Sequence, residues 1–83
     1  MLEITNAVYQ DSYRIYLEFN NGDNGIVDLE DSLWGPVFEP LKDIEKFKKL
    51  SVSKSFGTIV WENGADFAPE YLHSKLQRSS KAA

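Results

Sequence analysis

The residues best suited to chemistry lie near the end of the sequence, around its only histidine. His73 follows Glu70 by three positions, a spacing that puts both side chains on one face of a helix and that di-metal bundles use for ligands. With Asp66 added, these side chains could form the three-ligand site of a small metal-dependent enzyme. The sequence has no second histidine and no cysteine, so we expect an exposed helix face and neither a metal nor a cofactor.

Carboxylates offer a second route to catalysis, because two of them in different surroundings can divide acid and base roles. Asp28, Glu30 and Asp31 lie close together after a predicted strand. Their simpler interpretation is structural: Asp28 and Glu30 point to the outer face of a sheet, and Asp31 or Ser32 caps a short helical turn. The sequence also lacks a Gly-x-Ser-x-Gly elbow and a glycine-rich phosphate loop. We therefore predict no catalytic residue.

A group of lysines is the clearest candidate for binding a charged partner. Lys42, Lys46 and Lys49 share one face of a helix predicted at about 41–49, where they could meet RNA or an acidic protein surface. No motif interleaves aromatic and basic residues as base-stacking proteins do. The net charge of −4 also differs from that of the usual basic nucleic-acid binder. We expect a solvated helix face, with weak RNA binding as an alternative.

The composition indicates what kind of chain must position these residues. Hydrophobic residues make up 42% of the 83 positions, and no apolar run is long enough to span a bilayer, so we expect a cytoplasmic protein. We predict one domain over residues 1–76 and a mobile tail over residues 77–83. Residues 1–40 hold eight acidic side chains and one basic, a net −7, whereas residues 41–83 hold five acidic and eight basic, a net +3.

Three antiparallel strands open the predicted fold. Apolar and polar residues alternate over 13–19, which is typical of a half-buried strand. Shorter apolar stretches lie before it at 2–8 and after it at 26–29, and residues that favour turns separate the three segments. The sequence thus predicts a three-stranded antiparallel meander.

The pairing of these strands follows from the residues that must share the buried face. A three-residue loop in the second turn places Leu17 opposite Val27 and leaves Gly22 or Asp23 in the left-handed conformation. An even-length loop in the first turn places Ile4 opposite Leu17. Both choices gather the apolar side chains on one side of the sheet.

Helical and extended segments alternate in the second half of the chain. A helix at about 41–49 is followed by strands at 52–56 and 58–61, and Pro69 marks the start of a C-terminal helix. The fold class is therefore α+β, with a three-stranded antiparallel meander, a helix, two further short strands and a C-terminal helix.

Two surfaces are candidates for contact with another protein. Trp34 stands in an unusually apolar connection, 33–38, which either covers the core or forms an exposed docking patch. The outer face of the sheet carries Tyr16 among acidic side chains, and an open edge strand would invite pairing with a partner or a second copy. The predicted interaction surface comprises Tyr16, Glu18, Asp28, Glu30, Asp31 and Trp34.

A long motif lies in the second half of the chain. Its most specific stretch is Trp61-x-Asn63-Gly64-x-Asp66-x-Ala68-Pro69-x-x-Leu72. Together with Val27-Asp28-Leu29 and Phe38-Glu39-Pro40-Leu41, this stretch resembles the family called domain of unknown function 2442, over about residues 2–73.

The resemblance implies a small bacterial or phage α+β domain without established catalysis. Stand-alone members often accompany a small partner family in what look like toxin–antitoxin pairs, with this family in the antitoxin place. The motif can be explained by structure alone. Asn63 and Gly64 make a turn, Asp66 accepts N–H bonds at the next helix start, Pro69 begins that helix, and Trp61 closes the core.

We therefore predict a non-catalytic, antitoxin-like interaction domain whose acidic N-terminal sheet covers a basic site on a small toxin. Association between such surfaces should be fast and salt-sensitive. A metal-dependent enzyme using Asp66, Glu70 and His73 is one alternative, and a weak RNA-binding module is another.

Overall fold

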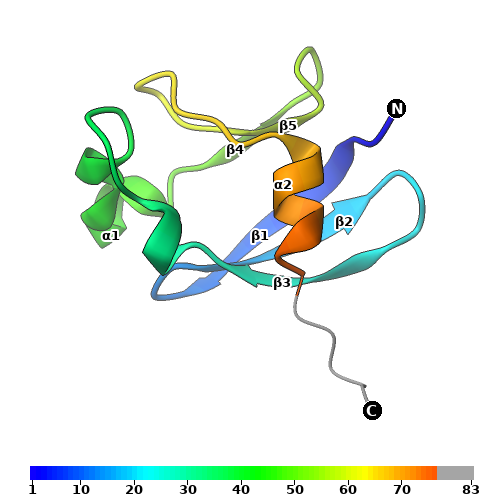
Figure 1. Cartoon of the computed structure of the whole chain (residues 1–83), viewed down its shortest axis with the longest axis horizontal. Coiled ribbons are helices and arrows are strands. Elements are labelled where there is room, and N and C mark those ends of the chain that lie inside the picture. Colours follow the sequence, from blue (N-terminus) through cyan, green and yellow to red (C-terminus); the bar gives the residue numbers. More distant parts are fainter. Residues whose placement is uncertain (77–83) are drawn as a thin grey trace.

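The first half of the chain forms the predicted meander. In the computed structural model, which describes residues 1–76, an antiparallel sheet contains β1 (Ile4–Asp11), β2 (Arg14–Phe19) and β3 (Asn24–Asp28), in that order across the sheet (Figure 1). Along β2, buried residues alternate with exposed or half-buried ones, as a strand with one face on the core requires. The α+β fold class is confirmed.

The loop between β2 and β3 has the predicted odd length but begins one residue earlier. The N–H of Phe19 donates to the carbonyl of Asp23 over 2.9 Å, so the loop consists of residues 20–22. Gly22 takes the left-handed conformation with φ of +92°. Leu17 consequently lies opposite Gly25, and the predicted pairing with Val27 is wrong. The shift spans two positions in register, so each side chain keeps its face.

The pairing predicted between β1 and β2 is also wrong. Ile4 lies opposite Phe19, and Ala7 lies opposite Leu17, because the register shifts between Ile4 and Asn6. This β-bulge inserts one residue and exchanges the two faces of the strand beyond it. Val8 therefore points outward and is 46% exposed, although its spacing from Ile4 had indicated the core side.

The single helix predicted at about 41–49 is two short turns. A 3₁₀ turn, η2 (Glu39–Lys42), is followed by α1 (Ile44–Phe47). Asp43 separates them, because its backbone is extended and its side chain accepts the N–H of Glu45 over 3.0 Å as the N-cap of α1. Lys42 therefore lies outside the helix that carries Lys46. Another 3₁₀ turn, η1 (Glu30–Ser32), follows β3.

The remaining elements match the predicted order. A two-stranded sheet consists of β4 (Ser51–Ser53) and β5 (Thr58–Val60), and α2 (Pro69–Ser74) begins at the predicted proline. β4 is shorter than the strand predicted at 52–56, because residues 54–57 turn back toward β5. The cap role predicted for Asp66 is wrong: α2 has no side-chain cap, and Asp66 forms an isolated bridge with Val60.

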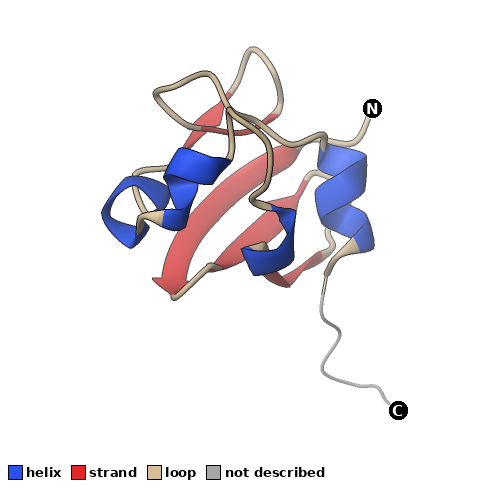
Figure 2. Cartoon of the chain, turned by 60° about the vertical axis from the view of Figure 1, so that its left-hand side comes forward, coloured by secondary structure: helices blue, strands red, loops and turns tan. Residues whose placement is uncertain are grey.

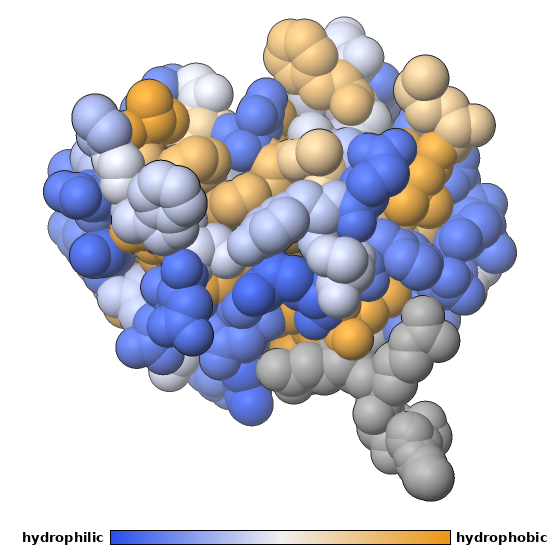
Figure 3. All heavy atoms as spheres, in the orientation of Figure 1, coloured by the Kyte–Doolittle hydropathy of each residue, from blue (hydrophilic) through white to orange (hydrophobic). Residues whose placement is uncertain are grey.

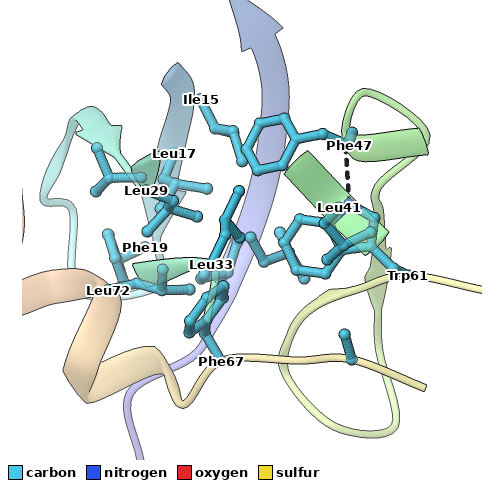
Figure 4. Packing of buried hydrophobic residues seen from close by; sticks show 14 residues of the cluster. Ile15, Leu17, Phe19, Leu29, Leu33, Leu41, Phe47, Trp61, Phe67 and Leu72 are labelled. Atoms are coloured by element: carbon cyan, nitrogen blue, oxygen red, sulfur yellow. Dashed lines mark hydrogen bonds between the residues drawn. The ribbon is translucent and has the colours of Figure 1, made fainter. Parts of the chain in front are cut away.

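The core lies between the inner face of the meander and the segments that cover it. Figure 2 shows the helical turns on one side of the three-stranded sheet. In the close-up of Figure 4, side chains from these turns and Trp61, which follows β5, lie on the same side as those of β2. Fourteen hydrophobic residues are buried there: Ile4, Ile15, Leu17, Phe19, Val27, Leu29, Leu33, Leu41, Phe47, Ile59, Trp61, Ala65, Phe67 and Leu72.

Polar groups inside this core are paired. The indole N–H of Trp61 donates to the carbonyl of Phe47 over 2.7 Å, and the hydroxyl of Thr58 donates to the carbonyl of Phe67 over 2.5 Å (Figure 4 draws the first). Within residues 1–76, no buried side-chain nitrogen or oxygen lacks a hydrogen-bond partner. In the same part of the chain, no helix has the length and apolar character needed to cross a bilayer. The tail predicted at residues 77–83 lies outside the described residues.

Replacing Trp61 by Phe tests how far the lid, meaning the helical turns and second sheet that cover the inner face of the meander, depends on this hydrogen bond. Trp61→Phe leaves the buried carbonyl of Phe47 without its donor and removes part of a ring that is only 4% exposed. We expect the free energy of unfolding to fall by about 2 kcal/mol, measured by urea denaturation. Trp34→Phe is the matched control, because Trp34 is 73% exposed, and it should change stability by less than about 0.5 kcal/mol. Equal losses in the two variants would contradict the prediction.

Candidate interaction site

The outer face of the meander gathers three residues of the predicted interaction surface. Tyr16, at the centre of the sheet, lies directly opposite Val8 on one side and Ile26 on the other. The Tyr16 hydroxyl donates to Glu18 over 2.8 Å, and this hydrogen bond raises the pKa of Tyr16. Asp28 ends the neighbouring strand on the same face. The face therefore carries a short apolar row bordered by Glu18 and Asp28, with Arg14 lying opposite Asp28.

The carboxylates at the end of β3 shape the next turn. Asp28 accepts the N–H of Glu30 over 3.0 Å in an Asx turn. No side chain caps η1, so the cap role predicted for Asp31 or Ser32 is wrong. Ser32 is instead buried, and its hydroxyl hydrogen-bonds the hydroxyl of Tyr71 over 2.6 Å. Glu30 and Asp31 are exposed on η1. The exposed carboxylates of Glu30 and Asp31 thus immediately precede Ser32, which bonds Tyr71 of α2.

The segment around Trp34 both covers the core and presents an exposed ring. Leu33 is buried and Phe38 is half-buried, whereas Trp34 between them is exposed. The connection therefore covers the core through Leu33 and Phe38 and leaves Trp34 exposed, and a docking role for Trp34 stays a prediction. Val37 and Tyr71 are also exposed large apolar residues. Figure 3 shows that on the face drawn, apolar atoms reach the surface in separate patches among hydrophilic side chains.

A pocket with aromatic walls lies beside Trp34. It has a volume of about 280 Å³ and is lined by Ser32, Trp34, Phe38, Phe67 and Tyr71. Three of these rings form a stack, with centroids 4.6 Å apart for Phe38 and Phe67 and 5.6 Å apart for Phe67 and Tyr71. Sequence reasoning missed Phe67 and Tyr71 as members of this site, because only the fold brings residues 67–71 against 32–38.

Lysines line a second hollow of about 340 Å³. Lys46 and Lys49 stand at this hollow above Leu41 and Trp61, whereas Lys42 is not among the lining residues. Because Asp43 also separates Lys42 in η2 from Lys46 in α1, the three lysines do not share one helix as predicted.

Asn63 also lines the second hollow, and its side chain serves the fold. The Asn63 amide donates to the carbonyl of Val37 over 2.8 Å, and its oxygen accepts the N–H of Ala65 over 3.1 Å. The turn predicted at Asn63 and Gly64 is confirmed, and Gly64 has a φ of +88°. The residues of the motif thus tie the turn after β5 to the segment that carries the aromatic pocket.

The only histidine has a structural partner. His73 Nε2 lies 2.7 Å from Asp23 Oδ2 in the β2–β3 loop, and its ring packs edge-on against Phe19 with centroids 5.1 Å apart. Asp66 and Glu70 are exposed elsewhere. In the described part of the chain, no three His, Asp or Glu side chains are placed to hold a metal ion together. The sequence could not indicate this pair, because fifty positions separate its members.

Comparison with known proteins identifies a family and little else. A family model described as "Protein of unknown function (DUF2442)" matches residues 4–77, which is most of the chain. No curated protein matches the chain, and no solved structure does.

The role of His73 can be tested by adding metal ions to the unfolding experiment. His73 bonds Asp23, and within residues 1–76 it belongs to no group of three potential metal ligands, so zinc or manganese should leave the unfolding midpoint unchanged. His73→Gln and Asp23→Asn should each destabilise the fold slightly, with a coupling of about 0.5 kcal/mol in a double-mutant cycle. A midpoint raised by zinc in the wild type but not in His73→Gln would show a metal site and contradict this interpretation.

Proposed function

Since the chain belongs to the DUF2442 family of proteins of unknown function, we propose its function from its own surface: it is a protein-interaction domain. The site of contact is the Trp34 patch, defined as Trp34, Val37, Phe38 and Tyr71 around the aromatic pocket. Glu30 and Asp31 of η1, which precede the pocket residue Ser32, form its acidic border.

The observation that carries this proposal is the exposure of Trp34 beside a pocket already walled by aromatic rings. An exposed tryptophan next to an apolar hollow is costly in water, and such side chains dominate the binding energy of protein interfaces. The pocket is also held in shape, because Ser32 hydrogen-bonds Tyr71 and the Phe67 ring is sandwiched between two others. A preformed site loses little conformational entropy when a partner binds.

The charge around the patch indicates the chemistry of the partner. Residues 1–40 carry a net −7, and the two carboxylates of η1 are exposed at the border of the pocket. The ammonium of Lys75 lies 5.8 Å from the centroid of the Tyr71 ring, so one ring of the pocket already interacts with a cation. A protein with a basic surface and one apolar side chain to insert would match both features.

The finer form of the proposal is an antitoxin-like role in the cytoplasm. The partner would then be a small basic toxin, and the Trp34 patch with its acidic border would cover the toxin's basic site. The resemblance described above supports this form, as does the concentration of negative charge in residues 1–40. Asp28 extends the acidic border toward the outer face of the meander, because its side chain accepts the N–H of Glu30 at the start of η1.

Truncating Trp34 should weaken binding of the partner without affecting the fold. In affinity capture from the native host, the wild type should retain a small basic protein, and Trp34→Ala should lower its affinity about tenfold or more. Phe56→Ala is the matched control, because Phe56 is 71% exposed but lies in the turn between β4 and β5. The proposal fails if the two variants behave alike, or if the captured protein binds Trp34→Ala as tightly as the wild type.

Reversing charge at the acidic border should weaken the same complex. Glu30→Lys with Asp31→Lys should reduce affinity about tenfold at about 0.05 M salt and much less at about 0.5 M, because screening already weakens the attraction there. Glu45→Lys with Glu62→Lys changes the net charge equally, but Glu45 lies in α1 and Glu62 follows β5, so calorimetry should detect a much smaller loss. Equal losses in the two double variants would show an effect of net charge only.

A further inference from the structure

The two edges of the meander differ in a way that indicates a further contact. β1, at one edge, has two register shifts and lies beside β4 and β5. The N–H of Ile4 also donates to the carbonyl of Gly57 over 2.8 Å, which joins this edge to the second sheet. Bulges and covering segments are the usual protection of an edge strand. β3, at the other edge, pairs with β2 in one uninterrupted register.

The outer backbone groups of β3 are available for pairing. The N–H of Phe19 bonds the carbonyl of Asp23, and the N–H of Leu29 bonds that of Tyr13, each over 2.9 Å, so odd-numbered residues of this strand face β2. The N–H and C=O groups of Asn24, Ile26 and Asp28 therefore face away from the sheet. Within residues 1–76, no other strand, backbone group or side chain bonds them.

We propose that β3 is a self-association edge, at which a second copy of this chain adds its own β3 in antiparallel orientation centred on Ile26. Two-fold symmetry requires an interface to be complementary to itself, and this strand meets that requirement. Ile26 lies opposite Ile26 of the second copy, and Asn24 lies opposite its Asp28. An amide thus faces each carboxylate, and no two like charges stand directly opposite each other.

The side chains on both faces of the sheet are compatible with this pairing. On the outer face, the row of Val8, Tyr16 and Ile26 would continue into the same row of the second copy, so that one apolar row crosses six strands. On the inner face, Val27 would lie beside Gly25 of the second copy, where the missing side chain leaves room. The pairing adds about six main-chain hydrogen bonds.

The expected affinity is low. Two five-residue strands joined edge to edge bury less than the roughly 1,200 Å² of a stable interface, so we expect a dimer that forms only at high concentration. The Trp34 patch lies outside β3, so this contact and binding of a basic partner are separate properties.

The test is sedimentation velocity from about 10 µM to about 1 mM. The wild type should show a concentration-dependent dimer, and Ile26→Pro should be monomeric throughout, because proline removes the central N–H donor without affecting the bonds to β2. Ile26→Lys should also be monomeric, since it places two like charges on the symmetry axis, and it serves if proline prevents folding. Circular dichroism confirms that each variant is folded.

Two further variants sharpen the result. Val8→Lys is the matched control, because Val8 lies in the same outer row but in β1, at the other edge of the sheet. The dimer should persist in this variant. Asn24→Lys should strengthen the dimer about fivefold, because it places an ammonium opposite Asp28 of the second copy. A wild type that is monomeric at about 1 mM overturns the proposal, and so does a dimer unchanged by both Ile26 variants. A dimer lost in Trp34→Ala but kept in Ile26→Pro would also overturn it and would place the interface at the Trp34 patch.

Discussion

The packing of Phe47 against the meander holds the rest of the structure together. Its ring lies edge-on against Tyr13, with centroids 5.2 Å apart, and 5.7 Å from the Trp61 ring, while its carbonyl accepts the Trp61 indole N–H. α1, which carries Phe47, has four residues and would not persist alone. Tyr13 also donates its hydroxyl to the carbonyl of Lys42 in η2. The sheet thus holds the lid through one buried aromatic residue and its neighbours.

This constraint explains why the function proposed above relies on surface residues. A chain of this size has one core, and the lid that closes it consists of turns with at most six residues each. Leu33, Leu41 and Leu72 are used to fill that core, and Ser32 and Asn63 hold the turns by hydrogen bonds. Trp34 contributes little to the packing, since most of its surface is exposed. A large side chain that the fold does not use is the strongest indication of a binding role.

The sequence predicted what depends on local pattern, and it failed where one residue changes the geometry. Alternation along β2 was sufficient to predict the meander, and turn residues predicted Gly22 and Gly64. The bulge after Ile4 has no marked signature, so the β1 pairing was wrong. The periodicity of apolar residues around 41–49 predicted one helix. Asp43 interrupts that helix as the N-cap of α1 but leaves the apolar spacing unchanged, so the pattern could not reveal the interruption. The apolar neighbours of Trp34 drew attention to that segment, whereas the pocket that Trp34 lines depends on tertiary contact between residues 32–38 and 67–71.

The two proposed contacts respond in opposite directions to salt, because the chain carries a net −4. Attraction between the acidic border and a basic partner is screened as salt rises, so that complex weakens. Two copies of an acidic chain repel each other, so screening strengthens their association at β3. Low salt therefore favours a single copy of this chain bound to its basic partner. High salt favours the dimer formed through β3 without that partner. A dimer would also present two Trp34 patches, so a partner with two basic sites would be held more tightly than one with a single site.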